Sequence, residues 1–163
     1  MSIHRDDSSG KHDSLTRHPS LQPLSRHHHH ALVLAQRLIK QSQPMDVLKA
    51  DLQTFWDNGG RLHFREEEEY LLPEYAKYRC IEVPAIQEML LEHVRIRSLA
   101  SEIAAGAGKD KLLMLGELLR NHVRKEERVI FPMMEEGIPD EQLRKLEPWF
   151  SEHTEASVFH GNA

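Results

Sequence analysis

The chain has 163 residues, a length that fits one compact domain. Its 21 Lys and Arg residues are interleaved with 26 Asp and Glu residues, which disfavours nucleic acid or an anionic membrane as a partner. The single Cys80 excludes an internal disulfide and a thiolate cage, so only His and carboxylate side chains remain to hold a metal. The absence of a membrane-spanning apolar run and of a secretory signal predicts a cytoplasmic protein.

The first 20 residues are polar and are predicted to be disordered, because they contain too few apolar side chains to fold alone. Three of the 12 histidines lie in this segment and are interpreted as bystanders: His4, His12 and His18. From Leu21 onward the apolar residues recur at helical spacing without sustained strand-like alternation, so the fold class is all-α. We expect a folded domain over residues 21–153 and a frayed tail over residues 154–163.

Four long helices and one short C-terminal helix are predicted. Helices of about 20 residues are about 30 Å long, and short connections between them favour an antiparallel up-down-up-down four-helix bundle. The second helix is expected to end before Pro73 and the fourth at Pro132, since proline removes a backbone donor. The predicted ranges are residues 21–41, 45–71, 83 to the glycine-rich stretch AAGAGKD, 110–132 and, for the terminal helix, 141–151.

One pattern, H-x3-E-x5-P, occurs in both the second and the fourth helix. The two copies read HFREEEEYLLP, residues 63–73, and HVRKEERVIFP, residues 122–132. Residues four apart lie about 40° apart around a helix, so the histidine and the fourth residue after it share one face. Each helix therefore offers one imidazole and one carboxylate to the same partner or ion, from His63 and Glu67 in one copy and from His122 and Glu126 in the other.

Neighbouring acids in the two copies are assigned to other roles. Glu68 and Glu127, the fifth residues after the histidines, lie about 140° away and are predicted to be surface residues in helix ion pairs. Glu66 faces inward more than these two residues do. Its counterpart in the other copy is Lys125, however, so Glu66 ranks below Glu67 as a ligand.

A third inward-facing histidine, His93, has apolar residues before and after it on one face of the third helix. A lone buried histidine is more often a hydrogen-bonded core residue than a ligand. However, two His/Glu pairs and a further histidine have little structural use in a bundle core, because each ionisable group brings a desolvation cost. We therefore interpret the set as a metal site, of the kind that helix bundles often enclose.

Four consecutive histidines, His27 to His30, lie in the first helix, and at most two of them can face the core. His28 has only apolar neighbours at helical spacing, namely Leu21, Leu24, Ala31, Leu32, Ala35 and Leu38. His29 and His30 would bring Gln or Arg residues onto the buried face, so we place both near the solvated edge. His28 is the predicted ligand, and His27 is second as a substitute ligand or an outer partner of one.

Together these residues resemble the hemerythrin-like (HHE cation-binding) family. The resemblance rests on a histidine early in the first helix, H-x3-E before a proline, a histidine in the third helix, and H-x3-EE-x3-F-P in the fourth. It covers residues 21–134 and implies a four-helix bundle around a non-haem di-iron centre. The resemblance implies that His28, His63, His93 and His122 supply the imidazoles and that Glu67 and Glu126 are the bridging carboxylates. The donor types also suit Mn or Zn.

The chain departs from the oxygen-carrying hemerythrins at two positions. Those proteins place a second histidine four residues after the first in the third helix, where this chain has Arg97, and an Asp five residues after the histidine of the fourth helix. A simple reversible oxygen carrier is therefore disfavoured, and Arg97 is placed to steer an anion. Gly59 and Gly60 are explained either by an access route for a small ligand or by close packing at a kink.

These features predict a protein that binds or senses O2, NO or reactive oxygen species such as peroxide, or iron itself. The alternatives are a di-iron oxidase or peroxidase and a purely structural bundle, and a binding or sensing protein is favoured over an enzyme. Because nothing resembles a fused regulatory domain, a sensor would need a partner protein. The aromatic residues Trp149, Phe150 and Phe159 near the terminal helix are expected to cap the bundle, with a homodimer surface as the alternative.

Overall fold

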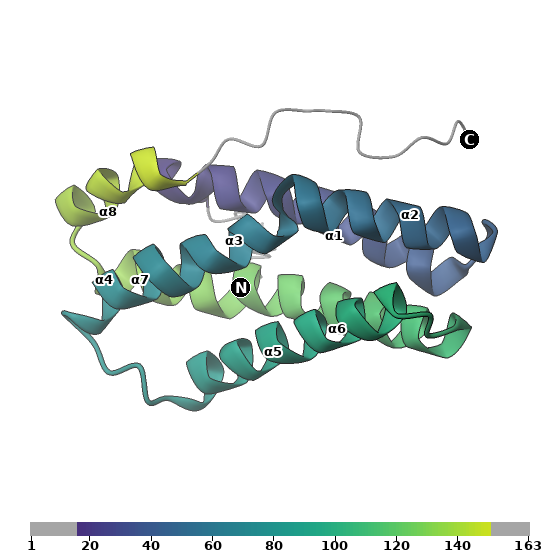
Figure 1. Ribbon diagram of the computed structural model, residues 1–163. Helices are drawn as coiled ribbons and strands as arrows, with labels where there is room; N and C mark the ends of the chain where they lie inside the picture. Colours follow the sequence, from purple (N-terminus) through teal and green to yellow (C-terminus); the bar gives the residue numbers. More distant parts are fainter. Residues whose placement is uncertain (1–15, 151–163) are drawn as a thin grey trace, which may run out of the picture.

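The structure is a computed structural model that describes residues 16–150 (Figure 1). Four long helical arms lie side by side and a short helix follows them, as the sequence predicts. The first arm is α1 (Gln22–Lys40), the third is α5 (Pro84–Ala104), and the short helix is α8 (Asp140–Leu146). Each arm packs on two neighbours, since α1 contacts α2 and α6, and α5 contacts the same two helices. The arrangement is a closed four-helix bundle.

The second and fourth arms consist of several segments each. The second arm contains α2 (Met45–Phe55), the π-helical turn η2 (Trp56–Gly60), α3 (Arg61–Glu66), the π-helical turn η3 (Glu67–Leu71) and α4 (Leu72–Ala76). The fourth arm contains α6 (Lys109–Lys125), the π-helical turn η4 (Glu126–Ile130) and α7 (Phe131–Gly137). Their starts agree with the predicted ranges to within one residue.

The predicted ends of the second and fourth arms are wrong, because both helices continue past their prolines. In η3 the N–H of Leu72 bonds to the carbonyl of Glu67, and in η4 the N–H of Phe131 bonds to that of Glu126. These widened turns come just before Pro73 and Pro132 and change the hydrogen-bond register where each proline would otherwise break it. Each arm then gains a further helical segment beyond the proline.

The first and third arms begin and end as their sequences predict. Pro84 occupies the first turn of α5, where a missing backbone N–H costs nothing, and the helix ends at the start of the glycine-rich stretch. Helix α1 ends at Lys40 because Gln41 adopts a left-handed conformation, with φ of 50°, and its N–H bonds to the carbonyl of Arg37. The bounds of both helices therefore follow from local backbone chemistry.

The segment that enters the bundle is packed from Arg17 onward, which differs from the predicted boundary at Leu21. Arg17 pairs with Glu135 at 2.9 Å, and His18 Nε2 lies 2.8 Å from Asp140 Oδ1, so His18 is not a bystander. Sequence reasoning missed these contacts because their partners lie more than a hundred residues away along the chain. The rest of the predicted N-terminal segment, with His4 and His12, and the predicted C-terminal tail lie outside the described residues.

Two apolar clusters fill the bundle on either side of a polar layer. Cluster 1 includes Leu38, Leu52, Ile103 and Leu115. Cluster 2 includes Leu21, Leu71, Ile86 and Phe131. On α1, Leu24 belongs to cluster 2, Ala31 belongs to cluster 1, and the buried His28 lies between them. The same order holds on α5 around His93, so the buried histidines share one level of the bundle.

The C-terminal helix closes the end of the bundle that holds cluster 2. Helix α8 is followed by the 3-10 turn Glu147–Trp149, which contains Pro148, and Phe150 is buried in cluster 2. Trp149 stays exposed and stacks on Tyr70 with the ring centroids 5.2 Å apart. Capping thus accounts for Phe150, whereas Phe159 lies outside the described residues.

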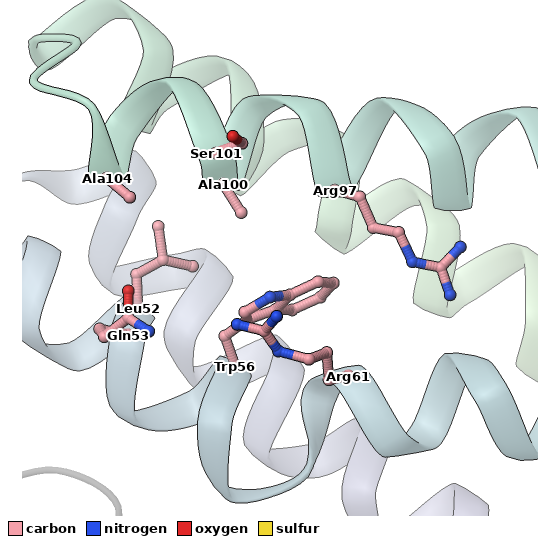
Figure 2. A pocket seen from close by; sticks show the side chains of 8 residues that line it. All are labelled: Leu52, Gln53, Trp56, Arg61, Arg97, Ala100, Ser101 and Ala104. Atoms are coloured by element: carbon pink, nitrogen blue, oxygen red, sulfur yellow. The ribbon is translucent and has the colours of Figure 1, made fainter.

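One further feature of the bundle is a cavity of about 320 Å³ between α2 and α5 (Figure 2). It is lined in part by Trp56, the first residue of the π-helical turn η2, and by Arg97 of α5. Among residues 16–150, no helix is long and apolar enough to cross a membrane.

Candidate metal centre

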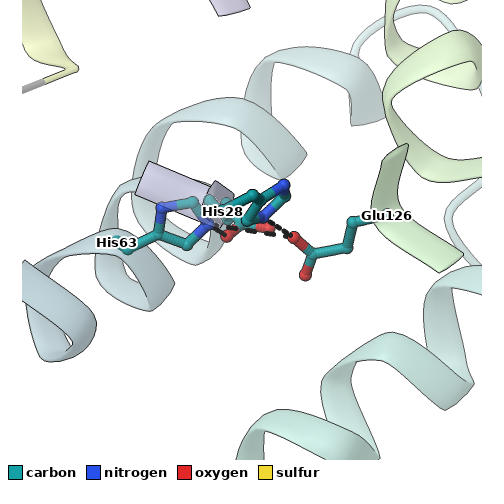
Figure 3. A group of neighbouring side chains, drawn as sticks. His28, His63 and Glu126 are labelled. Carbon is teal, nitrogen blue, oxygen red and sulfur yellow. Dashed lines mark hydrogen bonds and ion pairs between the residues drawn. The ribbon is translucent and has the colours of Figure 1, made fainter. Parts of the chain in front are cut away.

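The structure brings all six predicted site residues together in the polar layer, and all six are buried. They form two groups in which the ligand atoms lie within 4.8 Å of one another. The first group is His28, His63, Glu67 and Glu126, and the second is His93, His122 and Glu126. Figure 3 shows His28, His63 and Glu126 reaching the same point from three different elements.

Glu126 belongs to both groups, and each of its oxygens faces a different pair of histidines. Oε2 lies 2.8 Å from His28 Nε2 and 3.8 Å from His63 Nε2. Oε1 lies 3.2 Å from His93 Nε2 and 2.5 Å from His122 Nε2. A carboxylate in this position can contact two neighbouring cations at once, one through each oxygen.

Glu67 belongs to the first group only. Its Oε1 lies 2.5 Å from His63 Nε2, and the same separation holds between Glu126 Oε1 and His122 Nε2. Neither contact has the geometry of a hydrogen bond, since His63 Nε2, His122 Nε2 and both oxygens of Glu67 have no hydrogen-bond partner among residues 16–150. In both copies of H-x3-E, the two side chains thus point at a common position instead of at each other.

Three outer carboxylates contact the ring nitrogens that face away from the centre. Glu127 Oε1 lies 2.6 Å from Nδ1 of His28, and Glu68 Oε2 lies 3.1 Å from Nδ1 of His93. The prediction that these two acids are surface residues is therefore wrong. Both are partly buried, and each reaches a histidine on a neighbouring helix that its own helical face does not reveal.

The third outer carboxylate, Glu92, was not identified from the sequence. It lies next to His93 on α5 but reaches across to His122, with 2.8 Å between Oε2 and Nδ1. No motif marks it, because its partner is on another helix. The only sequence signal for the other two outer acids is that both copies of the pattern carry a second Glu.

Each outer carboxylate is held by a cation. Arg97 makes two contacts with Glu68, at 3.1 and 2.6 Å, and Arg17 lies 2.9 Å from Glu127. Lys125 lies 2.5 Å from Glu92 and 2.9 Å from Glu88. Three of the four histidines in the two ligand groups are therefore the inner members of His–Glu–cation chains. An outer carboxylate that accepts from Nδ1 leaves Nε2 free to bind a metal.

Aromatic contacts fix the ring planes of the histidines. Phe64 stacks on His93 with the centroids 3.9 Å apart. His63, the histidine without an outer carboxylate, stacks instead on the buried His27 at 4.8 Å. His27 thus supports His63 and is absent from both ligand groups. His29 is exposed and His30 is half-buried, as predicted.

Three other candidates lie beside the centre. Glu66 is buried on α3, the helix that also carries His63, but it belongs to neither ligand group. Arg97 does not point freely at the centre, because Glu68 holds it. A Cβ added to Gly60 would approach Phe55 Cε1 to 2.8 Å, so close packing explains this glycine.

Comparison with known proteins identifies the family. The family model described as Hemerythrin HHE cation binding domain matches residues 21–134. The chain belongs to this family. No match was found among curated proteins or among solved structures. The matched residues include all six members of the two candidate ligand groups, and the predicted family resemblance is confirmed.

The donor set of this hemerythrin domain fits a pair of cations. Imidazole nitrogens and carboxylate oxygens are the ligands that iron, manganese and zinc accept. The oxygens of Glu67 are buried without a hydrogen bond among the described residues, and an isolated buried charge is prohibitively costly. A cation between the side chains of each group would supply the missing partner.

The two inner carboxylates differ in their affinity for protons. Burial and the nearby charge of Glu126 raise the pKa of Glu67 well above its usual range. Burial acts the same way on Glu126, but contacts with His122, His28 and His63 outweigh it and hold the pKa of Glu126 well below its usual range. Without metal, Glu67 therefore holds a proton more tightly than Glu126 does.

The pKa values of the histidines also shift in opposite directions. Burial lowers the pKa of His63 to about 3, so this ring is neutral and its lone pair is available to a cation. Burial would also lower the pKa of His122, but Glu126 and Glu92 outweigh it and raise the value to about 9. The pKa of His28 is raised too, because Glu126 and Glu127 outweigh its burial. At neutral pH a cation must therefore displace a proton from His122, and protons also compete with it for His28.

Proposed function

We propose that this hemerythrin domain holds a non-haem di-iron centre and binds or senses O2, NO or reactive oxygen species such as peroxide, or iron itself. The main support is the position of Glu126, whose two oxygens face two different histidine pairs in a buried layer. Four imidazoles and two carboxylates suit iron, with manganese or zinc as alternatives. Iron bound there would supply the redox chemistry and the open coordination positions that small oxidants require.

The chain's own residues would set the properties of that centre. His28, His63 and Glu67 would hold one ion, His93 and His122 the other, and Glu126 both. The outer acids Glu68, Glu92 and Glu127 would keep three of the imidazoles in the tautomer that presents Nε2 inward. The two apolar clusters would exclude bulk water from both sides of the layer, which favours uncharged ligands such as O2 and NO.

Metal analysis of protein purified without nickel affinity chromatography tests the proposal. After iron-replete expression we expect about two iron ions per chain, as in other di-iron bundles. Glu126→Gln should lower the content of both ions, because both groups contain Glu126. Glu67→Gln should remove mainly one, since only the first group contains Glu67. Glu69→Gln, an exposed acid of the same EEEE run, is the matched control.

Two results would overturn this function. Protein that contains no iron, manganese or zinc would leave only a structural role for the bundle. Continuous turnover of peroxide with a reductant would instead identify an oxidase or peroxidase, whereas a reversible spectral change without turnover supports a binding or sensing protein. In the sensing case the output passes to a partner protein or to a second copy of the chain.

A further inference from the structure

The cavity between α2 and α5 combines an apolar wall with two arginines (Figure 2). Ala100 and Ala104 point from α5 toward Leu52 and Trp56 on the facing arm. Arg61 and Arg97 also line the cavity; the guanidinium group of Arg61 lies beside Trp56, and that of Arg97 lies at the edge nearer the candidate metal centre, where it pairs with Glu68 (Figure 2). Its volume of about 320 Å³ is near the lower end of the range for small-molecule sites, so it suits a compact ligand.

The two arginines differ in how firmly they are held. Arg61 is largely exposed, lies over the ring of Trp56 and, among residues 16–150, forms an ion pair only with the exposed Asp57, at 3.2 Å. An ion pair this exposed contributes little, so a ligand anion can compete for Arg61. Arg97 is more enclosed and gives two of its five N–H donors to Glu68. Guanidinium groups match carboxylates through paired hydrogen bonds, which favours a carboxylate ligand here.

Two chains of contacts lead from this cavity to the candidate metal centre. The polar chain runs from Arg97 to Glu68 and on to Nδ1 of His93. The other ring nitrogen of His93, Nε2, lies 3.2 Å from Glu126 Oε1. The aromatic chain runs from Trp56 to Phe64, at 5.7 Å, and Phe64 stacks on His93 at 3.9 Å. Both chains end on the same histidine of the second ligand group.

We propose that this cavity binds a small organic carboxylate with an apolar or aromatic body, and that the bound anion alters the surroundings of His93 through Arg97 and Glu68. The carboxylate is held by Arg61 and by the donors of Arg97 that Glu68 leaves available. The body of the ligand packs on Leu52, Ala100 and Ala104. The effect on His93 rests on the proposed metal centre, whereas binding to the cavity does not.

Binding is measured by tryptophan fluorescence in the full-length protein, whether or not iron has loaded. The chain has two tryptophans, so Trp149→Phe leaves Trp56 in the cavity wall as the only tryptophan. Titration with benzoate and with valerate should give a saturable change, and the comparison distinguishes an aromatic from an aliphatic body. Benzamide, which has the shape of benzoate without its charge, should give none.

Arg61→Gln should weaken benzoate binding by about tenfold or more, the loss expected for one charge-assisted hydrogen bond. Arg65→Gln is the matched control, because Arg65 lies one turn later, is equally exposed, forms the same i,i+4 ion pair with Glu69 and does not line the cavity. The proposal is overturned if neither carboxylate gives a saturable change, if benzamide binds as well as benzoate, or if the two arginine variants behave alike.

The link to the metal centre is tested by the absorption spectrum of the iron-loaded protein. Saturating benzoate should shift the spectrum, and Arg97→Gln should abolish the shift because it removes the donor that joins the ligand to Glu68. A spectrum unchanged by saturating benzoate would overturn the coupling. Failure to load iron would count against the proposed function alone, since the fluorescence titration does not depend on iron.

Discussion

At the scale of single residues, Glu126 and Glu67 show how position along similar helices leads to different chemistry. Both are the fourth residue after a histidine, and both are fully buried. Glu126 has histidines around both oxygens, which favour its charged form, whereas Glu67 has one histidine and the charge of Glu126 nearby. The charged carboxylate of Glu126 is therefore available to two cations, whereas the arrival of a cation would favour loss of the proton from Glu67.

Metal binding should consequently release protons at pH 7. The pKa of His122 is raised to about 9, so this ring carries a proton at neutral pH in the metal-free protein, and burial also raises the pKa of Glu67 well above its usual range. Apparent metal affinity should rise as the pH increases toward 9, because fewer protons then compete for His122. Calorimetric titration with Fe2+ under anaerobic conditions at pH 7, in two buffers with different ionisation enthalpies, should give about one proton or more per chain. Identical heats in the two buffers would contradict this.

The outer carboxylates should affect metal affinity although they do not touch the metal. Glu92→Gln and Glu127→Gln each replace the charged acceptor that orients a ring and makes it more basic with a neutral amide, so we expect each to lower metal affinity about 10- to 100-fold. Competition with a chromophoric chelator measures this. Glu117→Gln, an exposed acid of α6, is the control. Equal affinities for all three variants would mean that the rings are oriented by packing alone.

Sequence reasoning was successful for inward-facing residues and failed for contacts between helices. The apolar neighbours of His28 predicted that it faces the core, and the structure buries both His28 and its rival His27, since helical spacing determines which side chains share a face. The same rule misplaced Glu68 and Glu127, because it describes one helix and contains no information about histidines on the next. Glu92 was missed for the same reason.

At the scale of elements, the two copies of the pattern form equivalent structures. In each copy a π-helical turn begins at the inner glutamate, and the following proline starts a further helical segment. In each copy the second glutamate crosses to a histidine on a neighbouring helix, from η3 to α5 and from η4 to α1. The widened turns were not predicted, because a proline in a sequence indicates the end of a helix. Here the helix continues past each proline, because the π-helical turn first shifts the register of the backbone hydrogen bonds. Such turns are frequent at functional sites.

The contact between α1 and α6 depends on the absence of a side chain at Gly116. A Cβ added there would lie 2.9 Å from Leu38 Cβ and 3.0 Å from the carbonyl oxygen of Ala35, and neither atom can move without its backbone. Gly116→Val should therefore destabilise the protein by about 1–3 kcal/mol, even though valine has the higher helix propensity. Thermal unfolding measures this. Glu117→Val, at the exposed next position, is the control, and equal midpoints for the two variants would contradict the packing argument.

At the scale of the whole molecule, the bundle consists of two apolar clusters separated by a layer of buried ionisable groups. Four imidazoles and two carboxylates from four helical arms meet in this layer, which costs desolvation energy that the apolar clusters must offset. A ligand that binds this layer only in the folded state stabilises all four arms together. The position of the centre therefore couples metal content to the stability of the entire fold.

Chelation should accordingly lower the thermal midpoint of the metal-loaded protein. A ligand present at about a thousand times its dissociation constant stabilises the folded state by about 4 kcal/mol. For a chain of this size that corresponds to a shift on the order of 10 °C. We expect EDTA to lower the midpoint of the wild-type chain by this amount and to leave Glu126→Gln unchanged, because that variant has already lost the carboxylate shared by both groups. An equal effect of EDTA on both proteins would place the stabilising metal elsewhere, and no effect on either would mean that the apolar clusters alone hold the four arms together.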